Sequence, residues 1–301
     1  MVGERVSRRR ALGVLAAVGA GVAGLVTAAR SLGSPAPRAQ VAAGTVREVE
    51  QYGDLPRQRG EWWLPPGAPD GPLPTVVLVH GGYWRGSYWR GCWRGSYDLS
   101  LEDAVAADLA ARGSLVWNVD YRPSDQPWPA TLADAAAAYD HLATGRFADR
   151  VDPSRVSVVG HSAGGHLALW LASRDRLPAG APGGPRTGPP VAAVVAQAPV
   201  AALADGARLG LGGGAVQALL GGGPDELPER YAVADPLALL PTGVPTACVH
   251  AAGDDLVPIG QSETYVAAAG PVARLVRVPG AHFEHLDPAS AACAAMRGAL
   301  A

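Results

Sequence analysis

The sequence predicts a single α/β domain, with helices on both faces of a mainly parallel sheet. From about Thr45 onward, short apolar runs alternate with segments of helical composition, which is the pattern of repeated strand-helix units. Runs such as Thr75–Val79 are apolar throughout and end in glycine, as expected of strands buried on both faces. The chain has 301 residues, of which 48% are hydrophobic, so it can bury a large core.

The expected elements follow one another along the chain, with a turn at Asp152-Pro153-Ser154. Short apolar runs predict strands at Thr75–Val79, Leu115–Val119, Arg155–Val159, Val191–Val195, Thr246–His250 and Val272–Val278. Helical composition, with an apolar stripe in the second, predicts helices at Leu99–Arg112, Ala130–Thr144, His166–Ser173 and Leu286–Leu300. Residues 204–225 carry runs of glycine and little periodicity, so we expect a flexible lid within about 198–243.

The first thirty residues have the features of an export signal or a membrane anchor. Ser7-Arg8-Arg9-Arg10 precedes a charge-free run, Ala11–Ala29, and this resembles a twin-arginine signal, which predicts export. A helix of that run would span about 28 Å, so an uncleaved anchor is a second interpretation. A wrongly placed start codon in a cytoplasmic protein is a third. Residues 31–44 are rich in Pro, Ala and Gly and are interpreted as a linker, which leaves 45–301 for the domain.

Composition excludes several classes of function. A net charge of −2 and a pI near 6.4 do not favour nucleic acid, which needs a basic face. All 25 basic residues are Arg, so mechanisms that need a Lys, such as a Schiff base or a Ser-Lys dyad, are excluded. The three cysteines lie far apart without a metal-like grouping. We therefore expect neither a metal nor an organic cofactor.

Gly160-His-Ser-Ala-Gly164 fits the G-x-S-x-G pattern of a nucleophile. Ser162 follows an apolar strand and precedes a helix, where a nucleophile elbow places its serine, and small neighbours permit the tight reversal. The alternative is an ordinary helix N-cap serine in a Gly-rich turn.

The serine needs a base and an acid, which in the order Ser, acid, His come from later loops. His282 follows a strand at its carboxyl end and is the predicted base, whereas His285 is expected at the start of the last helix as a solvated or capping residue. Asp254 and Asp255 both lie on the preceding loop. The frame D-x-x-V-P selects Asp254 as the acid, and Asp255 is expected to be a surface or capping carboxylate.

Two backbone amides are needed to bind the oxyanion of a tetrahedral intermediate. One is expected from Ala163, directly after the serine. The other is expected from the segment His80-Gly-Gly-Tyr83 that follows a strand, at either Gly82 or Tyr83. His80 itself is expected to be a structural hydrogen-bonding residue.

Together, these motifs resemble the α/β-hydrolase superfamily over roughly Val46 to the C-terminus. The resemblance rests on His80-Gly-Gly-Tyr-Trp84, Gly160-His-Ser-Ala-Gly-Gly-His166, Asp254-x-x-Val-Pro258, His282-Phe283 and Asp287-Pro288. HGGYW and GHSAGGH, with Tyr52-Gly53 and Pro56-x-Gln58, are most similar to the kynurenine formamidase and small carboxylesterase branch. The resemblance implies Ser162, Asp254 and His282 as a triad. His250-Ala-Ala-Gly253 departs from the usual His-Gly before the acid.

The segment after the HGG motif contains a near-repeat, Trp84-Arg-Gly-Ser-Tyr88 and Trp93-Arg-Gly-Ser-Tyr97. Removing residues 84–92 restores the run of the similar sequences, so the repeat is interpreted as a nine-residue tandem duplication in a surface loop. A tolerated insertion is the favoured interpretation. The alternative is an aromatic rim for an aryl substrate or for a membrane interface.

The sequence thus predicts a serine hydrolase acting on small-molecule esters or aryl formamides, with Tyr83 and Trp84 forming one wall of the pocket. Contact with a membrane is expected only through the N-terminal segment. A peptidase-like hydrolase is a weaker alternative, because no propeller-sized domain precedes the hydrolase core. A non-catalytic hydrolase-fold binding protein is another, although all three triad positions are filled.

Overall fold

The computed structural model describes residues 43–90 and 93–300. The chain divides into two units, 1–38 and 39–301, and the description below concerns the second. The signal or anchor expected at 1–30 and most of the expected linker lie outside the described residues, so export stays a prediction. Within the described residues, no helix is both long enough and apolar enough to cross a bilayer.

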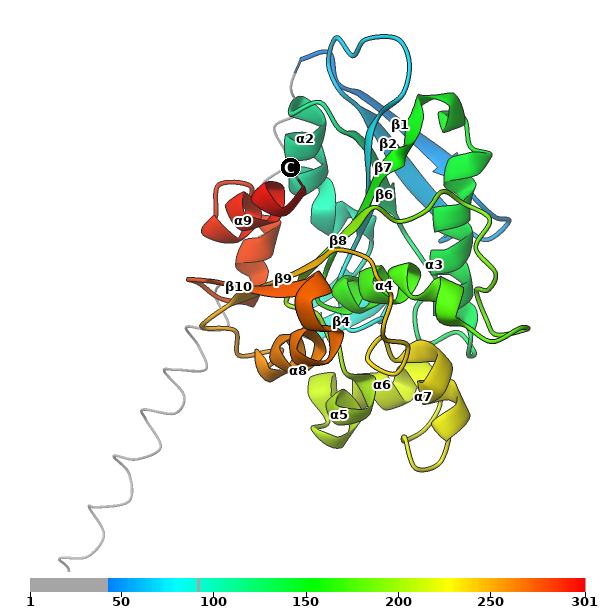
Figure 1. Ribbon diagram of the computed structural model, residues 1–301, viewed down its shortest axis with the longest axis vertical. Coiled ribbons are helices and arrows are strands. Elements are labelled where there is room, and N and C mark those ends of the chain that lie inside the picture. Colours follow the sequence, from blue (N-terminus) through cyan, green and yellow to red (C-terminus); the bar gives the residue numbers. More distant parts are fainter. Residues whose placement is uncertain (1–42, 91–92, 301) are drawn as a thin grey trace, which may run out of the picture. The chain divides into compact units, whose positions relative to one another are not determined.

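The described residues form an eight-stranded sheet in the order β1-β2-β6-β3-β7-β8-β9-β10 (Figure 1). The strands are β1 Val46–Gln51, β2 Arg59–Leu64, β3 Leu73–Val79, β6 Leu115–Val119, β7 Val151–His161, β8 Ala193–Gln197, β9 Thr246–Ala251 and β10 Ala273–Val278. From β6 to β10 all neighbours are parallel, whereas β2 is antiparallel to both β1 and β6. The predicted α/β class with a mainly parallel sheet is confirmed.

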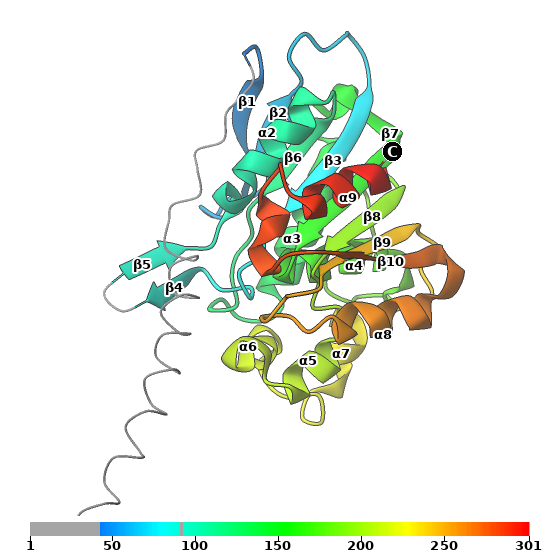
Figure 2. The ribbon, with the colours of Figure 1, turned by 90° about the vertical axis from the view of Figure 1, so that its left-hand side faces the viewer.

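Helices pack on both faces of this sheet (Figures 1 and 2). The helices α2 (Asp103–Ala111) and α9 (Ala291–Leu300) pack on one face, where alternate strand residues form one apolar cluster. The opposite face buries a larger cluster under α3 (Ala130–Asp140), α4 (Ala163–Ala172) and α8 (Gly260–Ala269). Because these strands are parallel, their carboxyl ends lie at the same edge of the sheet. Both faces are covered by helices, so this edge is where an α/β protein places its site.

Two differences from the sequence prediction change the kind of element and not only its exact ends. The expected turn at Asp152-Pro153-Ser154 lies inside β7, where Asp152 Oδ1 accepts a hydrogen bond from the Ser154 amide at 2.9 Å. The register of β7 against β3 shifts at this point, so the strand bends and continues. The expected last helix, 286–300, is a 3₁₀ turn at His282–Leu286 followed by α9.

The expected lid contains more regular structure than its sequence predicts. It folds as α5 (Leu203–Arg208), α6 (Leu211–Leu220) and α7 (Pro228–Ala234), which we call the cap. At the start of α6, Gly212, Gly213 and Gly214 all have positive φ angles of 59°, 64° and 80°. A residue with a Cβ is strained in this left-handed turn, so the glycines are needed there, and they obscure the helical periodicity on either side.

The repeated segment forms a β-ribbon rather than an irregular loop. Its strands are β4 (Ser87–Arg90) and β5 (Trp93–Ser96), which pair antiparallel with Ser87 opposite Ser96 (Figure 2). At the base of the ribbon, the Tyr97 amide donates to the Gly86 carbonyl at 3.3 Å. The ribbon therefore leaves and rejoins the domain at nearly the same point.

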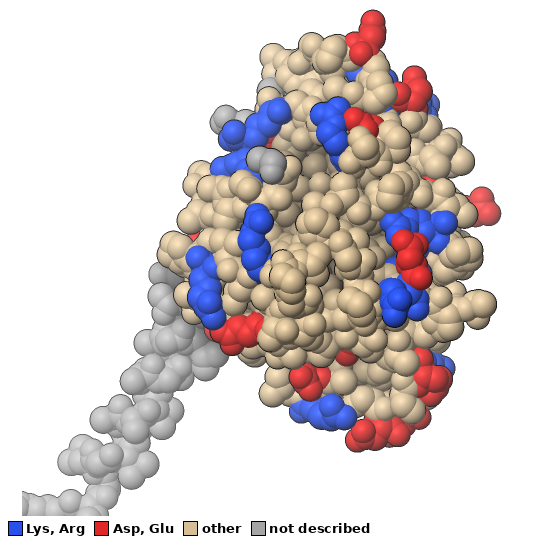
Figure 3. Space-filling view, viewed as in Figure 1, with Lys and Arg blue, Asp and Glu red and all other residues tan. Residues whose placement is uncertain are grey.

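Charged side chains are dispersed over the face drawn in Figure 3. Arginine and acidic side chains are scattered there among a larger uncharged area. The formal net charge of the whole chain is −2. This face therefore offers a polyanion no concentrated positive field.

Candidate active site

Ser162 lies in a strained turn between β7 and α4. Its backbone angles are φ 57° and ψ −117°, outside the regions that residues with a Cβ ordinarily occupy. The Ser162 amide donates to the carbonyl of Gln197, at the end of the adjacent strand β8, at 2.8 Å. Its side chain makes no capping hydrogen bond to α4, so the N-cap interpretation does not describe this serine.

Two glycines make the turn sterically accessible. A Cβ at Gly160 would lie 2.1 Å from the Gly164 carbonyl oxygen, and one at Gly164 would lie 2.0 Å from the carbonyl oxygen of Val79. Both distances are far below van der Waals contact, so only glycine fits at either position. The G-x-S-x-G pattern therefore has a packing reason in this chain, namely the close approach of α4 to β3 and β7.

His282 and Asp254 are brought together at the carboxyl edge of the sheet. Nδ1 of His282 lies 2.7 Å from Oδ2 of Asp254. The other carboxylate oxygen of Asp254 accepts hydrogen bonds from the amides of Leu256 and Val257, each at 2.9 Å. Asp255 is exposed and pairs with no described residue. Of the two aspartates, Asp254 alone contacts the histidine.

The environment of Asp254 keeps its carboxylate ionised. Burial acts to raise its pKa, but hydrogen bonds from His250, His282 and the Val257 amide hold the pKa well below its ordinary value. A carboxylate accepts only, so His282 carries its proton on Nδ1. In the neutral imidazole, Nε2 is then the nitrogen without a proton, the one that can accept a proton as a base.

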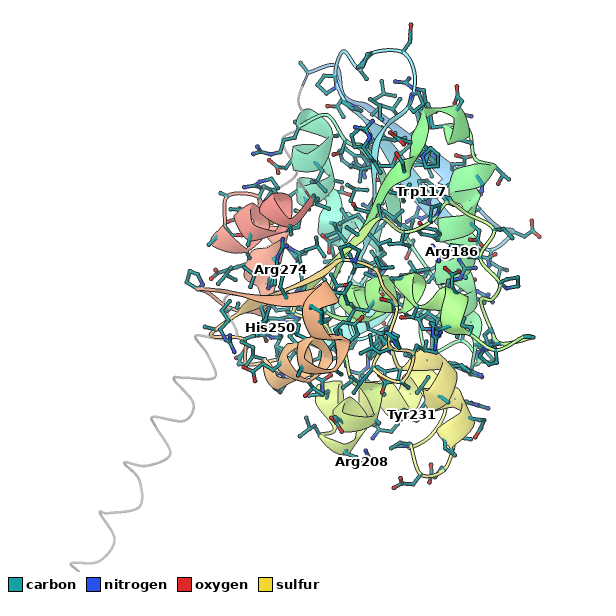
Figure 4. The ribbon with its side chains drawn as sticks, viewed as in Figure 1. Trp117, Arg186, Arg208, Tyr231, His250 and Arg274 are labelled. Carbon is teal, nitrogen blue, oxygen red and sulfur yellow. The ribbon has the colours of Figure 1, made fainter. Side chains whose placement is uncertain are left out.

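His250 organises the acid loop, a role that the sequence did not reveal. From β9 it lies against α8 (Figure 4), where its Nδ1 is 2.8 Å from the Ser262 hydroxyl. Its Nε2 is 2.9 Å from the Val257 carbonyl and 3.5 Å from Asp254 Oδ2. These contacts hold the loop that presents the acid. A buried histidine at the end of a strand, just before the acid, was the available signal.

The prediction that His285 is solvated or capping is wrong. It lies in the 3₁₀ turn 282–286, is fully buried, and neither ring nitrogen has a hydrogen-bond partner among the described residues. Burial and the nearby His282 lower its pKa from 6.5 to about 3, so it is neutral at pH 7. Its ring centroid lies 5.5 Å from that of His161, and it makes no contact with Asp254 that could activate it as a base.

The segment from His80 to Tyr83 approaches the serine closely. A Cβ at Gly81 would lie 3.1 Å from Ser162 Cβ, so this glycine permits the approach. His80 Nδ1 lies 2.7 Å from the Gly81 carbonyl oxygen. In a trans peptide the carbonyl and the following N–H point in opposite directions, so the Gly82 N–H points away from His80.

The candidate oxyanion donors have free amides. No described residue accepts a hydrogen bond from the N–H groups of Gly82, Tyr83 or Ala163. For Ala163 this is expected, because the first N–H groups of a helix have no partner within it. Gly82 adopts φ 112°, and a Cβ there would lie 2.4 Å from the Tyr97 ring, so glycine is required.

The opening segment supports the same loop. Nε2 of His80 lies 3.2 Å from Asp120 Oδ1, an oxygen that also accepts from Arg57 at 2.7 Å. Arg57 also donates to the Tyr97 carbonyl at 2.6 Å, and the Tyr52 hydroxyl donates to the Asp120 carbonyl at 2.7 Å. His80 is thus a structural hydrogen-bonding residue here, held by a network that starts in the segment 52–58.

Trp84 packs inside the domain against helix α4. It is fully buried, and its indole N–H donates to His166 Nδ1 on α4 at 3.1 Å. Its place in the wall of the pocket stays a prediction. Tyr83 is partly exposed and donates its hydroxyl hydrogen to the Leu256 carbonyl on the acid loop at 3.1 Å.

The site is closed in this structure. Ser162 is 2% exposed and His282 3%, and no hydrogen bond joins their side chains in the part of the chain that the structure describes. Tyr83 packs against the cap, since a Cβ at Gly212 would lie 2.5 Å from its ring. Arg85 donates to the Gly212 carbonyl at 2.6 Å. Catalytic hydrogen bonds often form only once substrate is bound.

The described residues contain no cluster of three or more His, Cys, Asp or Glu side chains that could hold a metal ion. The candidate nucleophile Ser162, the hydrogen-bonded pair of His282 and Asp254, and the free amides of the candidate oxyanion donors lie at or near the carboxyl edge of the sheet.

A protein-family model, BD-FAE, matches residues 63–268. The chain belongs to the BD-FAE family. The matched range includes the HGG segment, the serine turn and Asp254, while His282 lies beyond its end.

Curated relatives of this BD-FAE chain match over a shorter range. Carboxylesterase NlhH of Mycobacterium tuberculosis is 34% identical over 112 residues, which covers 36% of this chain and 32% of that protein. Isoprenylcysteine alpha-carbonyl methylesterase ICME of Arabidopsis thaliana is 35% identical over 124 residues, 41% of this chain and 26% of that protein. The matches therefore span about a third or less of these relatives' lengths.

Solved structures of esterases share the fold of the BD-FAE chain. Esterase B from Lactobacillus rhamnosis superposes with a TM-score of 0.68 at 20% identity, covering 94% of this chain and 91% of that one. A truncated carbohydrate esterase from gut microbiota gives a TM-score of 0.67 at 22% identity, covering 82% and 93%. With the strand order, these likenesses establish an α/β-hydrolase fold. The kynurenine formamidase branch stays a prediction.

Proposed function

We propose that this protein is a serine hydrolase that cleaves esters of carboxylic acids through an acyl-enzyme on Ser162. The observation that carries the proposal is the hydrogen-bonded pair of Asp254 and His282 at the same edge of the sheet as the strained turn of Ser162. A serine hydroxyl is a poor nucleophile unless a base removes its proton and a carboxylate orients that base. The esterase names of the curated relatives also support ester cleavage.

In the proposed mechanism, Ser162 Oγ attacks the ester carbonyl carbon while His282 Nε2 takes the hydroxyl proton. Asp254 holds the His282 ring and stabilises the imidazolium that forms. The developing oxyanion accepts hydrogen bonds from the Ala163 amide and from an amide of Gly82–Tyr83. His282 then gives the proton to the leaving alcohol, and a water molecule, activated by the same base, hydrolyses the acyl-serine.

Small esters are the substrate class we propose. Ser162 is almost fully buried, and Tyr83, next to the HGG segment that borders the serine, packs against the glycine turn of the cap. Enclosure favours a compact acyl group over a polypeptide. Aryl formamides are a second substrate class, suggested by the resemblance of the HGGYW and GHSAGGH segments.

The test is labelling with a fluorophosphonate, run beside hydrolysis of p-nitrophenyl esters of increasing acyl length and of N-formylkynurenine. We expect the wild-type protein to be labelled and to cleave short esters. Ser162→Ala should lose the label and at least about 10³-fold in kcat. Turnover of N-formylkynurenine above that of the esters would assign the formamidase activity. A folded wild-type protein that is neither labelled nor active would favour a non-catalytic binding protein instead.

A further inference from the structure

His161 links the turn that carries the nucleophile to the turn that carries the base. It is the residue between Gly160 and Ser162, and its side chain is almost fully buried. Its Nε2 lies 2.9 Å from the main-chain carbonyl oxygen of His282. These two turns are 121 residues apart in the sequence, and this bond joins them directly.

The protonation state of His161 follows from its surroundings. A carbonyl oxygen only accepts hydrogen bonds, so Nε2 of His161 must carry a proton. Burial, together with the neighbouring His282 and His285, lowers the pKa of His161 well below its ordinary value. The ring is therefore neutral at pH 7, and it acts as a fixed donor without placing a second positive charge beside the base.

The ring of His161 also packs against the groups that must stay in register. Its centroid lies 4.6 Å from that of His282 and 5.5 Å from that of His285. A Cβ at Gly81 would lie 3.2 Å from its Nδ1, so the ring also borders the HGG segment. Base turn, serine turn and HGG segment therefore meet around one imidazole.

We propose that His161 is a positioning residue, whose hydrogen bond to the His282 carbonyl sets the separation of Ser162 Oγ and His282 Nε2. The proposal rests on the serine hydrolase function above. Asp254 holds one end of the His282 ring and so fixes its rotation. That contact acts on the side chain, whereas the His161 bond ties the backbone of the base to the serine turn. A misplacement of about 1 Å can lower a rate about 10²-fold.

The test compares His161→Leu, which removes the donor, with His161→Gln, whose amide N–H can reach the same carbonyl. We expect kcat for a p-nitrophenyl ester to fall about 10- to 100-fold in the leucine variant, with KM changed by less than about threefold. The rate of fluorophosphonate labelling should fall in parallel, because it uses the same serine and base. The glutamine variant should recover to within about fivefold of wild type.

Several outcomes would overturn the proposal. One is a folded leucine variant with wild-type kcat, and another is a glutamine variant as impaired as leucine, since only packing would then matter. If the leucine variant does not fold, the amides His161→Gln and His161→Asn are compared, because asparagine is too short to reach. Equal kcat in these two variants would then reject the positioning role. Absence of labelling in wild type would instead reject the proposed function.

Discussion

Oδ2 of Asp254 lies 2.7 Å from Nδ1 of His282, whereas the side chain of the adjacent Asp255 is exposed and forms no hydrogen bond with His282. Asp254→Asn should therefore lower kcat about 10³- to 10⁴-fold, because an amide at this position favours the wrong tautomer of the base. Asp255→Asn is the matched control, one residue away, and should stay within about twofold of wild type. Ester hydrolysis of the two purified variants checks this, and equal losses would contradict the assignment of the acid.

His285 should make the protein acid-sensitive. Its folded pKa, about 3, lies below the unfolded value of about 6.5, so in this window the unfolded state binds the proton and stability falls as the pH drops. His285→Phe keeps an aromatic ring and removes the titration. The free energy of unfolding of the variant minus that of wild type should be about 2 kcal/mol larger at pH 5 than at pH 7.5, so the variant gains stability relative to wild type as the pH falls.

Urea unfolding at both pH values measures this difference. Activity of His285→Phe should remain within about threefold of wild type, because His282 is the proposed base. A relative stability that does not change with pH would mean that His285 titrates normally in the fold.

The glycine turn of the cap offers a second matched pair. Gly212→Ala and Gly213→Ala both place a Cβ at a positive φ, which costs about 1–2 kcal/mol. Only at Gly212 would the methyl group meet the ring of Tyr83, at 2.5 Å, whereas Gly213 has no neighbour within 4 Å. We expect both to lower the urea midpoint, and Gly212→Ala to lower it more because of this contact. Only Gly212→Ala should also change kcat/KM, by about tenfold, and identical kinetics would show that Tyr83 does not respond to the cap.

Removal of the ribbon should leave a folded, active protein. Deleting residues 88–96 joins Ser87 to Tyr97, and Ser87 already lies opposite Ser96 across the ribbon. The urea midpoint should equal that of wild type within experimental scatter, and kcat/KM should stay within about threefold of wild type. If a folded deletion variant lost more than about tenfold in kcat/KM, the ribbon would be part of the substrate site.

The site could be predicted where chemistry demands particular residues in a particular order. Gly160 and Gly164 are required by backbone contacts below 2.5 Å, so the elbow was visible in the sequence. Asp254 follows the fully buried strand β9, and His282 follows β10, whose apolar residues are interrupted by two arginines. His161 and His250 act through hydrogen bonds to carbonyls of residues distant along the chain or across a loop, and no local pattern encodes such a partner.

The fold was predicted less well where burial depends on distant segments. The edge strand β1 alternates between exposed and half-buried residues, and its antiparallel neighbour β2 contains Arg59 and Glu61, so neither has the apolar run of a central strand. Glycines mask the helix α6, and the 3₁₀ turn 282–286 is too short for a periodic signal. The burial of His285 was not predicted, because polar residues near a chain end ordinarily face solvent.

Each copy of the repeated segment supplies one contact to the rest of the domain. Trp84, from the first copy, is buried against His166, and Tyr97, from the second, packs beneath Gly82. If one copy were deleted, the remaining copy would have to supply both contacts. The nine residues from Tyr88 to Ser96 add to a chain that already has both contacts. These nine residues can therefore accumulate substitutions while Trp84 and Tyr97 keep the contacts that the fold uses.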